Sequence, residues 1–287
     1  SKNEVSIMRR SLLFIPANKP GMLQSANIYP CDSVIFDLED AVSVDQKDSA
    51  RILLKNFLNA FPLNKEVVIR INALDTNFFM DDLDYLVSDK IDAIMLPKAN
   101  VEYIIRLNEI LNIFEKTKNL TKKIKIIPII EEACAVLQVE EIVKLERVDG
   151  LLLGAEDLTR DLEIERTKTG DEILYPRFKI AYACKAYAID AIHTPFTDVN
   201  DFEGLRKDVY NAKKIGFTSK AVIHPNQIEI INECFSPTKD QIEYANKVLL
   251  AAQDHSGVFS LDGKMIDKPI IERCKKILEK ARKYDLL

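Results

Sequence analysis

Residues 150–157, with the sequence GLLLGAED, combine an apolar run with side chains that could bind a metal ion. The run GLLL is typical of a strand buried on both faces. Gly154 and Ala155 follow, and small residues at a strand end let a ligand approach the backbone closely. Glu156 and Asp157 come next, and carboxylate oxygens are the ligands that Mg²⁺ prefers. A second interpretation is that the two carboxylates only cap the following helix, and this stretch alone leaves both open.

Short apolar runs alternate with helical segments along the chain, and these elements would position such side chains. The runs that fit strands are 11–15, 33–36, 67–71, 93–96, 126–130, 150–153, 191–192 and 220–223. Segments of helical period are 49–61, 101–118, 133–145, 173–188 and 202–215. Eight strand–helix units in about 225 residues predict an α/β fold of the (β/α)8 TIM barrel type. A doubly wound open sheet is the rival fold, but its glycine-rich phosphate turn does not occur in the sequence.

Polar side chains follow the predicted strands. Active sites of parallel barrels lie at the carboxyl ends of the strands, so the sequence predicts a site on this rim. A single polar residue at a strand end also arises from an ordinary turn, and the prediction therefore rests on the whole set. The set includes Lys19, Asp37, Glu39, Asp40, Arg70, Lys98, Glu131, Glu156, Asp157, His193 and His224.

The strand–helix alternation stops after Ile231. Residues 236–239, SPTK, predict a helix start with Pro237 at the first helical position. We therefore predict a catalytic barrel over residues 1–235. A C-terminal helical extension over residues 236–287 would then seal the barrel or pack on a neighbouring subunit, contributing to the oligomer and the active site.

Two further elements are expected inside the extension. Residues 257–267 form a short apolar–polar segment with a turn at Asp262-Gly263. Residues 269–284 predict a final amphipathic helix.

The composition limits the class of partner. The 287 residues carry a formal net charge of −5, with 47% hydrophobic and 30% charged residues. This balance argues against nucleic acid or an anionic membrane as a partner. No run approaches the roughly 18 apolar residues of a membrane span. Five scattered cysteines without a CxxC pair predict thiols in a reducing, cytoplasmic compartment. They are Cys31, Cys134, Cys184, Cys234 and Cys274.

Eight stretches, in order along nearly the whole chain, resemble the citrate lyase β-subunit family, which comprises citryl- and malyl-thioester lyases related to malate synthase. They are residues 9–20 (RRSLLFIPANKP), 34–42 (VIFDLEDAV), 67–76 (VVIRINALDT), 94–98 (IMLPK), 149–158 (DGLLLGAEDL), 193–205 (HTPFTDVNDFEGL), 223–228 (IHPNQI) and 261–271 (LDGKMIDKPII). The resemblance implies a (β/α)8 barrel with a C-terminal extension, usually assembled as a homotrimer. It also implies Mg²⁺-dependent cleavage of the carbon–carbon bond of a 3-hydroxyacyl thioester.

The resemblance also implies roles for individual residues. Glu131 and Asp157 correspond to the Mg²⁺ ligands, and Arg70 to the residue that contacts the substrate oxygens. Asp267 corresponds to a catalytic aspartate that reaches the site of a neighbouring subunit. The other implied positions are Asp37, Glu39 and Asp40, which support the metal-bound waters and Arg70; Gly154, Ala155 and Glu156, whose backbone with Asp157 holds a keto-acid carboxylate; and Lys19, which faces the phosphates of the carrier.

Local patterns resemble different subgroups of the family. Residues 163–175, EIERTKTGDEILY, and residues 28–30, IYP, are similar to citrate lyase, whereas 194–196 and 223–225 resemble relatives that use coenzyme A. The carrier, acyl-carrier protein or coenzyme A, therefore stays open, as does a complex with an α subunit and acyl-carrier protein. One departure follows Glu131, where EACA replaces a small stretch that usually ends in glycine.

The residue types suit the implied reaction, in which a citryl thioester gives oxaloacetate and an acetyl thioester. The tertiary hydroxyl loses a proton and becomes the ketone, while the other half leaves as a thioester enolate. A divalent ion stabilises the developing alkoxide as a Lewis acid. Arg70 presents fixed donors to the same charge, and an aspartate protonates the enolate carbon.

Other interpretations stand beside this one. Lysis of malyl-CoA or citramalyl-CoA, or thioester hydrolysis, fits the same motifs, and a non-catalytic carrier-binding subunit fits the fold. Arg70 could simply pair with Asp37 inside the barrel. His193 and His224 could be acid–base groups, although we favour hydrogen bonding to their neighbours. A phosphatase would want Asp-x-Asp where the chain has Asp37-Leu38-Glu39.

Overall fold

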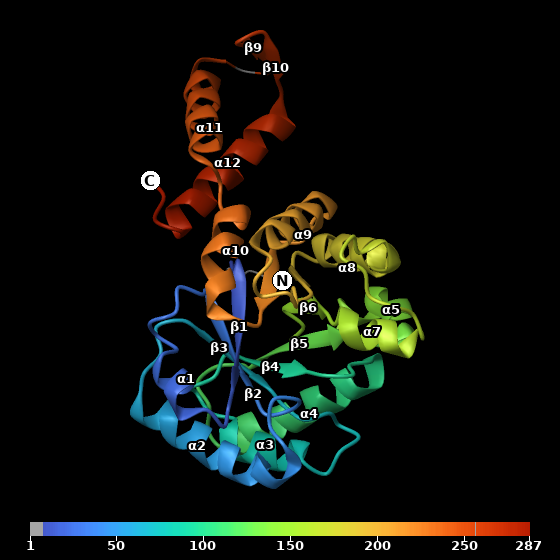
Figure 1. Cartoon of the computed structure of the whole chain (residues 1–287). Helices are drawn as coiled ribbons and strands as arrows, with labels where there is room; N and C mark the ends of the chain where they lie inside the picture. The colour runs from blue at the N-terminus through green and yellow to red at the C-terminus, as the bar shows by residue number, and fades with distance from the viewer. Residues whose placement is uncertain (1–7, 256) are drawn as a thin grey trace. The chain divides into compact units, whose positions relative to one another are not determined.

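Eight parallel strands form a closed barrel in chain order, and β1 pairs with β8 to close the ring (Figure 1). The computed structural model describes residues 8–255 and 257–287. Each predicted apolar run lies on a strand to within one residue at either end, which confirms the barrel. The strands are β1 (Ser11–Pro16), β2 (Ser33–Asp37), β3 (Glu66–Arg70), β4 (Ala93–Leu96), β5 (Lys125–Ile130), β6 (Gly150–Leu153), β7 (Asp190–His193) and β8 (Ser219–Val222).

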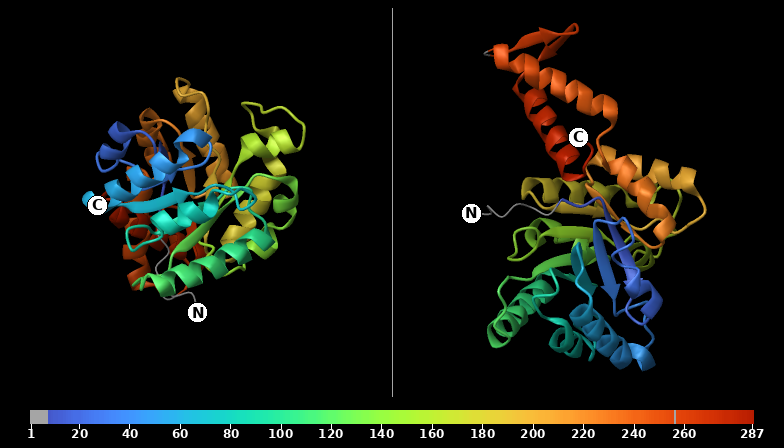
Figure 2. Two further views of the ribbon diagram at one scale, coloured as in Figure 1. Left: turned by 90° about the horizontal axis from the view of Figure 1, so that it is seen from below. Right: turned by 90° about the vertical axis from the view of Figure 1, so that its left-hand side faces the viewer.

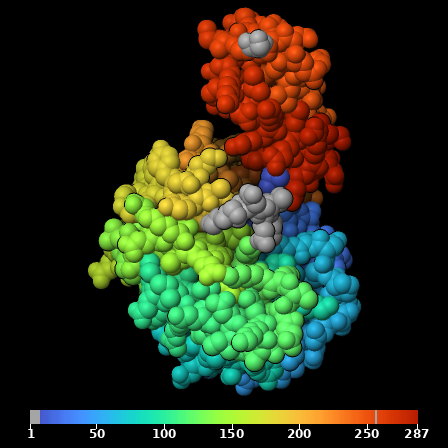
Figure 3. Space-filling model, turned by 180° about the vertical axis from the view of Figure 1, so that it is seen from behind, coloured from blue at the N-terminus to red at the C-terminus, as the bar shows by residue number. Residues whose placement is uncertain are grey.

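Helices surround these strands (Figure 2). They are α1 (Pro20–Gln24), α2 (Lys47–Ala60), α3 (Phe79–Leu86), α4 (Val101–Thr117), α5 (Ala133–Leu137), α6 (Val139–Ile142), α7 (Ala155–Asp161), α8 (Leu174–Ala186), α9 (Phe202–Ile215) and α10 (Ile228–Phe235), with the 3-10 turns η1 (Val44–Gln46), η2 (Asp171–Ile173) and η3 (Pro225–Gln227). In Figure 3, side chains from the middle of the chain, in green, form a continuous outer surface on one side of the barrel. Within the described residues no helix is long and apolar enough to cross a membrane.

One predicted helix, over residues 133–145, is divided in the structure. It forms α5 and α6, separated by Gln138 with φ −92° and ψ 0°. The Gln138 amide is shared between the carbonyls of Cys134 and Ala135 at 3.2 and 3.1 Å, and its side chain accepts from Val101 N at 3.0 Å. This long-range side-chain contact explains the break, which local periodicity does not contain.

The two-residue repeat of the strands continues from the barrel core into its mouth. The core side chains Ile35, Val68, Ile129, Leu152 and Ile192 fill the interior. Successive side chains of a strand point to opposite faces, so the residue two positions later again points inward. Those later residues are Asp37, Arg70, Glu131, Gly154 and Thr194. The register that builds the core therefore also aims these polar residues at the carboxyl end of the barrel.

The amino end of the barrel is closed by a buried ion network. Arg9 donates to Glu66 at 2.9 and 2.6 Å, to Asp149 at 2.8 Å and to Asp190 at 2.7 Å. Burial alone would lower the pKa of Arg9, but these three carboxylates raise it. The guanidinium thus links the starts of β1, β3, β6 and β7, and it holds the end of the barrel opposite the mouth.

The chain divides into two compact units, residues 1–231 and 232–287, at a point within α10. The second unit contains α11 (Lys239–Ala251), η4 (Ala252–Asp254), the antiparallel pair β9 (Phe259–Leu261) and β10 (Lys264–Ile266), and α12 (Lys268–Lys283). It has its own apolar core, formed by Ile242, Ala245, Val248, Phe259, Ile266, Cys274, Leu278 and Ala281.

The local predictions for this unit are largely confirmed. The turn at Asp262 and Gly263 has φ values of 50° and 74°, as a tight hairpin requires. The final helix is α12. The predicted start of α11 is wrong by two positions, because Thr238 caps the helix through a capping box with Gln241 and Pro237 lies before the cap.

Candidate functional site

A cavity of about 620 Å³ opens at the carboxyl ends of the strands. Its polar lining comes from Asp37 at the end of β2, Arg70 at the end of β3, Glu131 after β5 and the first turn of α7. Its apolar lining includes Phe14 and Ile223. The site predicted at the carboxyl ends of the strands is therefore a cavity, and most of the expected site residues line it.

Arg70 is held in place from several sides. Its Nε and Nη2 donate to the two carboxylate oxygens of Asp37 at 2.8 and 2.6 Å, and its guanidinium lies over the Phe14 ring at 4.8 Å. Asp37 itself accepts from the backbone N–H groups of Glu39 and Ala41 at 2.9 and 3.1 Å. The expected alternative, a pair between Arg70 and Asp37, is thus present, and it orients an arginine that also lines the cavity.

The third nitrogen of Arg70 faces two more carboxylates. Its Nη1 lies 3.1 Å from Glu39 Oε2 and 3.8 Å from Asp40 Oδ2. Glu39 Oε2 is buried and makes no well-directed hydrogen bond. Burial raises the pKa of Glu39 to about 7 against the opposing pull of Arg70, and Asp40, Asp37 and Asp157 raise it further. One guanidinium therefore does not neutralise the negative charge gathered here.

Glu131 is only 5% exposed at the end of β5. Its Oε1 accepts from Lys98 N at 2.6 Å. Burial raises the pKa of Glu131 to about 8, and the charges of Glu39 and Asp157 add to the rise. A buried carboxylate among like charges is stabilised in its ionised form by a cation.

Asp157 lies in the first turn of α7 and shares two hollows with Glu131. Both residues line the main cavity and a smaller adjoining one of about 120 Å³. Asp157 Oδ1 also lies 3.0 Å from Arg160 Nη2 on the outer side of the helix. The two expected metal ligands are therefore brought to one place by β5 and α7.

Gly154 is required by the packing between these two residues. A Cβ atom at this position would lie 2.8 Å from Glu131 Cβ and 2.8 Å from Ile129 Cγ2, closer than side chains tolerate. Its backbone N–H donates to Ile130 O at 2.9 Å, so Gly154 cannot move away without breaking this hydrogen bond to β5. Glycine thus lets the start of α7 lie directly against Glu131.

The unusual turn after Glu131 is closed by a contact from α7. Ala133 N donates to Asp161 Oδ2 at 2.7 Å, and Glu132 is extended before α5. The turn that departs from the family pattern is therefore tied to the helix that carries Asp157.

The donors at this site fit a hard divalent cation. Glu131 and Asp157 offer oxygen ligands only, and Glu39 adds a buried oxygen without a good partner. Within residues 8–255 and 257–287 no group of three or more His, Cys, Asp or Glu side chains is placed to hold a metal ion, so the protein would supply two carboxylates at most. Mg²⁺ suits such a site because it binds one or two carboxylates and keeps several waters.

The remaining residues singled out from the sequence have contacts of their own. Lys19 is exposed at the N-cap of α1, and it is not among the described residues that line the cavity. Asp267 belongs to the second unit, where its side chain caps α12 by accepting from Ile270 N at 3.2 Å. His224 is exposed and accepts from Asn226 N at 3.2 Å. His193 is fully buried in a hydrogen-bond network, so both histidines bond to neighbours as expected.

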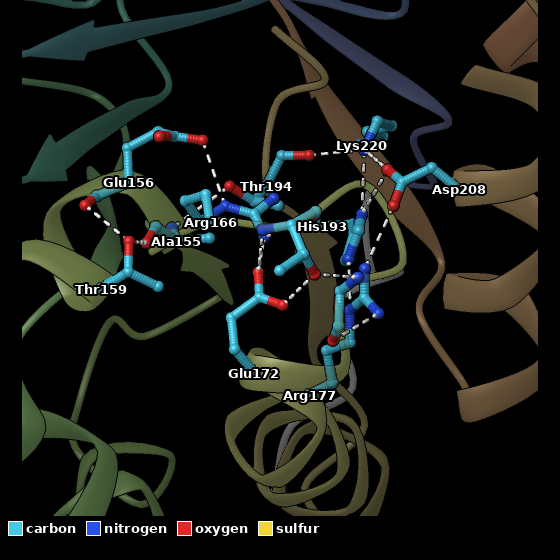
Figure 4. A network of polar contacts seen from close by, with 12 residues as sticks. Ala155, Glu156, Thr159, Arg166, Glu172, Arg177, His193, Thr194, Asp208 and Lys220 are labelled. Carbon is cyan, nitrogen blue, oxygen red and sulfur yellow. Dashed lines mark hydrogen bonds and ion pairs between the residues drawn. The ribbon is translucent and has the colours of Figure 1, made fainter. Parts of the chain in front are cut away.

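That network was not predicted from the sequence (Figure 4), and it includes Thr194, which also lines the cavity. Lys220 Nζ donates to Thr194 O at 2.5 Å, and Thr194 Oγ1 accepts from Ala155 N at 3.2 Å. Asp208 and Arg177 complete the group around His193. One signal was available, namely a lysine inside the otherwise uncharged buried strand β8.

The fold and site define a class of protein, a (β/α)8 barrel whose mouth offers two carboxylates for a divalent cation beside an oriented arginine. Such a site suits metal-assisted chemistry on anionic oxygen substrates. Residues 10–225 match the family described as HpcH/HpaI aldolase/citrate lyase. The chain belongs to this family.

Similar proteins span nearly the whole chain. Citrate lyase subunit beta of Haemophilus influenzae is 38% identical over 96% of this chain and 97% of its own. Mitochondrial citramalyl-CoA lyase of Rattus norvegicus is 30% identical over 97% of this chain and 88% of its own. The structure of CitE from Mycobacterium tuberculosis in complex with magnesium, acetoacetate and coenzyme A has a TM-score of 0.79 and 29% identity, and the match covers 97% of this chain and 100% of that one.

The contacts of Gly154 predict the effect of a single methyl group. Gly154→Ala should displace Glu131 and destabilise the barrel by about 1–3 kcal/mol, because the added Cβ overlaps two side chains. Urea denaturation measures the stability, and calorimetry should show weaker divalent-cation binding by the folded protein. Gly21→Ala is the matched control, since nothing lies within 4 Å of its added Cβ and alanine favours the helix. Equal stability of Gly154→Ala and wild type would contradict the packing argument.

Proposed function

We propose that this chain is a Mg²⁺-dependent carbon–carbon lyase that cleaves a 3-hydroxyacyl thioester, with a citryl thioester as the foremost substrate. The products would be oxaloacetate and an acetyl thioester. The observation that carries this proposal is the meeting of Arg70, Glu131 and Asp157 in one cavity of a barrel from the aldolase/citrate lyase family. The similarity to citrate lyase subunit beta favours citryl over other acyl groups.

Glu131 and Asp157 would hold the metal ion. When bound, Mg²⁺ supplies Lewis-acid stabilisation of a substrate oxygen that gains negative charge. The backbone of Gly154, Ala155 and Glu156 borders the same cavity and would hold the keto-acid carboxylate. Gly154 has no side chain and Ala155 has only a methyl group, so a ligand has room near the main chain at the helix start.

Arg70 would stabilise the developing alkoxide. Asp37 fixes two of its nitrogens, so the guanidinium needs no reorientation when the charge forms. Glu39 and Asp40 lie at its third nitrogen, where they would accept from metal-bound waters. Orientation of a fixed donor toward the reacting oxygen is often the largest catalytic contribution.

Asp267 would exchange the proton of the enolate carbon. We propose that it acts in the site of a neighbouring subunit of a homotrimer, because it belongs to the second unit and not to a strand end of the barrel. Cyclic symmetry would repeat such a shared site identically in every subunit.

The carrier would approach the exposed side of the mouth. Lys19 is solvent-exposed at the start of α1 and could pair with carrier phosphates. The citrate lyase relative supports acyl-carrier protein within a complex that includes an α subunit, and the coenzyme A complex of the related structure supports a free thioester. We place the protein in the cytoplasm, in keeping with its scattered thiols.

A second candidate is citramalyl-CoA or malyl-CoA lysis, or hydrolysis of the thioester. The similarity to citramalyl-CoA lyase favours it, and the same cavity residues would serve. A non-catalytic carrier-binding subunit is disfavoured, since it would not need Arg70, Glu131, Asp157 and Asp267 together.

A substrate screen tests the proposed reaction. Citryl-, malyl- and citramalyl-thioesters of coenzyme A and of acyl-carrier protein are assayed for release of a keto acid. We expect citryl thioester to be cleaved fastest, turnover to stop in excess EDTA, and Mg²⁺ to restore it. Full turnover in EDTA would refute the metal dependence, and no keto acid from any of the thioesters would refute the lyase proposal.

The raised pKa of Glu131 predicts how the metal site responds to pH. At pH 7 a carboxyl group with a pKa of about 8 is largely protonated, and Mg²⁺ needs the ionised form. Binding should therefore release protons at pH 7, and the affinity should rise with pH up to about 8 and then level off. Calorimetry in buffers of different ionisation enthalpy measures the released protons. A pH-independent affinity between 6 and 8 would contradict the combination of a raised pKa at Glu131 with its role as a ligand.

The shared site can be tested by mixing two inactive chains. Asp267→Ala and Arg70→Ala should each abolish turnover, because each removes one side of the site. Oligomers assembled from both chains should regain part of the activity, since some sites then combine an intact Arg70 with an intact Asp267. Each variant refolded with itself is the control. Verified mixed oligomers without activity would contradict sharing between subunits.

A further inference from the structure

Four polar side chains form a sealed group behind the candidate site. Lys220 on β8 and His193 on β7 are completely buried, and Arg177 on α8 and Asp208 on α9 are nearly so (Figure 4). Ionised side chains are rarely buried so completely unless each has a partner. The protons in this group can be assigned from the hydrogen-bond partners.

The position of the proton on His193 follows from Arg177. Arg177 Nε always carries a hydrogen, and it donates to His193 Nε2 at 2.9 Å. Burial lowers the pKa of His193 to about 3, so the imidazole is neutral at physiological pH. A neutral imidazole that accepts at Nε2 carries its hydrogen on Nδ1.

Lys220 Nζ is the polar atom nearest to that nitrogen. His193 Nδ1 lies 2.9 Å from Lys220 Nζ and 3.5 Å from Asp208 Oδ2. An ammonium group has three N–H donors and no lone pair, so it cannot accept this hydrogen bond. An amine has two donors and one lone pair. Lys220 Nζ has two acceptors, Thr194 O and Asp208 Oδ2, both at 2.5 Å, and one donor, His193.

The balance of charge agrees with an amine. Arg177 Nη2 pairs with Asp208 Oδ1 at 3.1 Å, which leaves this group neutral if Lys220 is uncharged. Arg166 is a further cation close enough to act on Lys220, and its own partners are Glu172 and Glu156. An ammonium at Lys220 would therefore add an uncompensated charge to a buried site.

Lys47 provides an internal comparison. It is also buried, yet its Nζ donates to three backbone carbonyls, Leu38 O at 2.9 Å, Glu39 O at 3.1 Å and Val42 O at 3.1 Å. Burial lowers the pKa of both lysines. Of these two lysines, Lys47 alone has three acceptors, one for each N–H of an ammonium group. The two buried lysines should therefore differ in charge.

We propose that Lys220 is an uncharged amine at neutral pH and a positioning residue for the first turn of α7. It holds the carbonyl of Thr194, whose hydroxyl accepts from Ala155 N at 3.2 Å. Ala155 begins the helix that carries Asp157 two residues later. The charge assignment stands on the hydrogen bonds, the burial and the charge balance of this group, whereas the positioning role rests on the proposed metal site.

The charge of Lys220 can be measured directly. The protein is labelled with [ε-¹³C]lysine, and the chemical shift of each ε-carbon, which differs between amine and ammonium, is followed against pH. We expect one resonance to report an amine at pH 7 in the wild type. Lys220→Arg should remove it, and Lys47→Arg should remove an ammonium resonance instead. A wild-type spectrum in which every lysine is an ammonium at pH 7 would overturn the assignment.

The positioning role is tested by Mg²⁺ binding measured by calorimetry, without substrate. Lys220→Met should raise the Mg²⁺ dissociation constant about tenfold, because Thr194 and the start of α7 lose their anchor. Arg147→Met is the matched control, since it removes a buried cation that bonds to Glu115 and Ile124 O on the helical side of the barrel. This variant should lose stability but keep the Mg²⁺ affinity.

Thr194→Val replaces Lys220→Met if the latter does not fold, because it removes only the hydroxyl that accepts from Ala155 N. The same weakening is expected. Unchanged Mg²⁺ affinity in these variants, or equal weakening in Arg147→Met, would overturn the positioning role. A wild type that binds no Mg²⁺ would overturn the proposed metal site and the positioning role with it, while the charge of Lys220 is decided by the resonance alone.

Discussion

The two-residue repeat of the barrel strands is the constraint on which the site depends. In β3 and β5, Val68 and Ile129 point into the barrel core, and Arg70 and Glu131 point inward from the next position of the same repeat. A shift of one residue in either strand would turn the apolar side chain and the polar one outward together. One strand register therefore determines both the packing of the apolar core and the position of Arg70 and Glu131.

The two ends of the barrel handle buried charge in opposite ways. At the amino end, the guanidinium of Arg9 forms ion pairs with three carboxylates, so the buried positive charge has partners on three sides. At the carboxyl end, Arg70 pairs mainly with Asp37, and among the described residues Glu131 accepts a hydrogen bond from the backbone N–H of Lys98 alone. The first arrangement stabilises the barrel. The second leaves negative charge that a cation can neutralise, and such incomplete pairing is what a binding site requires.

The sequence predicted the barrel well because most strands are short apolar runs, and polar residues at the end of each run mark its carboxyl end. The sequence also predicted that Arg70, Glu131 and Asp157 meet, because their motifs resemble those of a known family and because each follows or ends a predicted strand. It did not predict the break at Gln138 or the cap at Thr238, which depend on particular side-chain hydrogen bonds. The network around Lys220 was hidden too, since its four members lie on α8, β7, α9 and β8 and meet only when these successive elements pack together.

The support beneath Arg70 has a consequence for recognition. Two backbone N–H groups hold Asp37, Asp37 holds the guanidinium in two places, and the Phe14 ring lies beneath it. A free arginine loses rotamer entropy when it grips a ligand, at a cost of about 0.5–1.5 kcal/mol per immobilised side chain. Here that freedom is already lost when the chain folds. The mouth of the barrel can therefore discriminate among ligands by shape, because an arginine so confined does not follow a ligand that places its oxygen elsewhere.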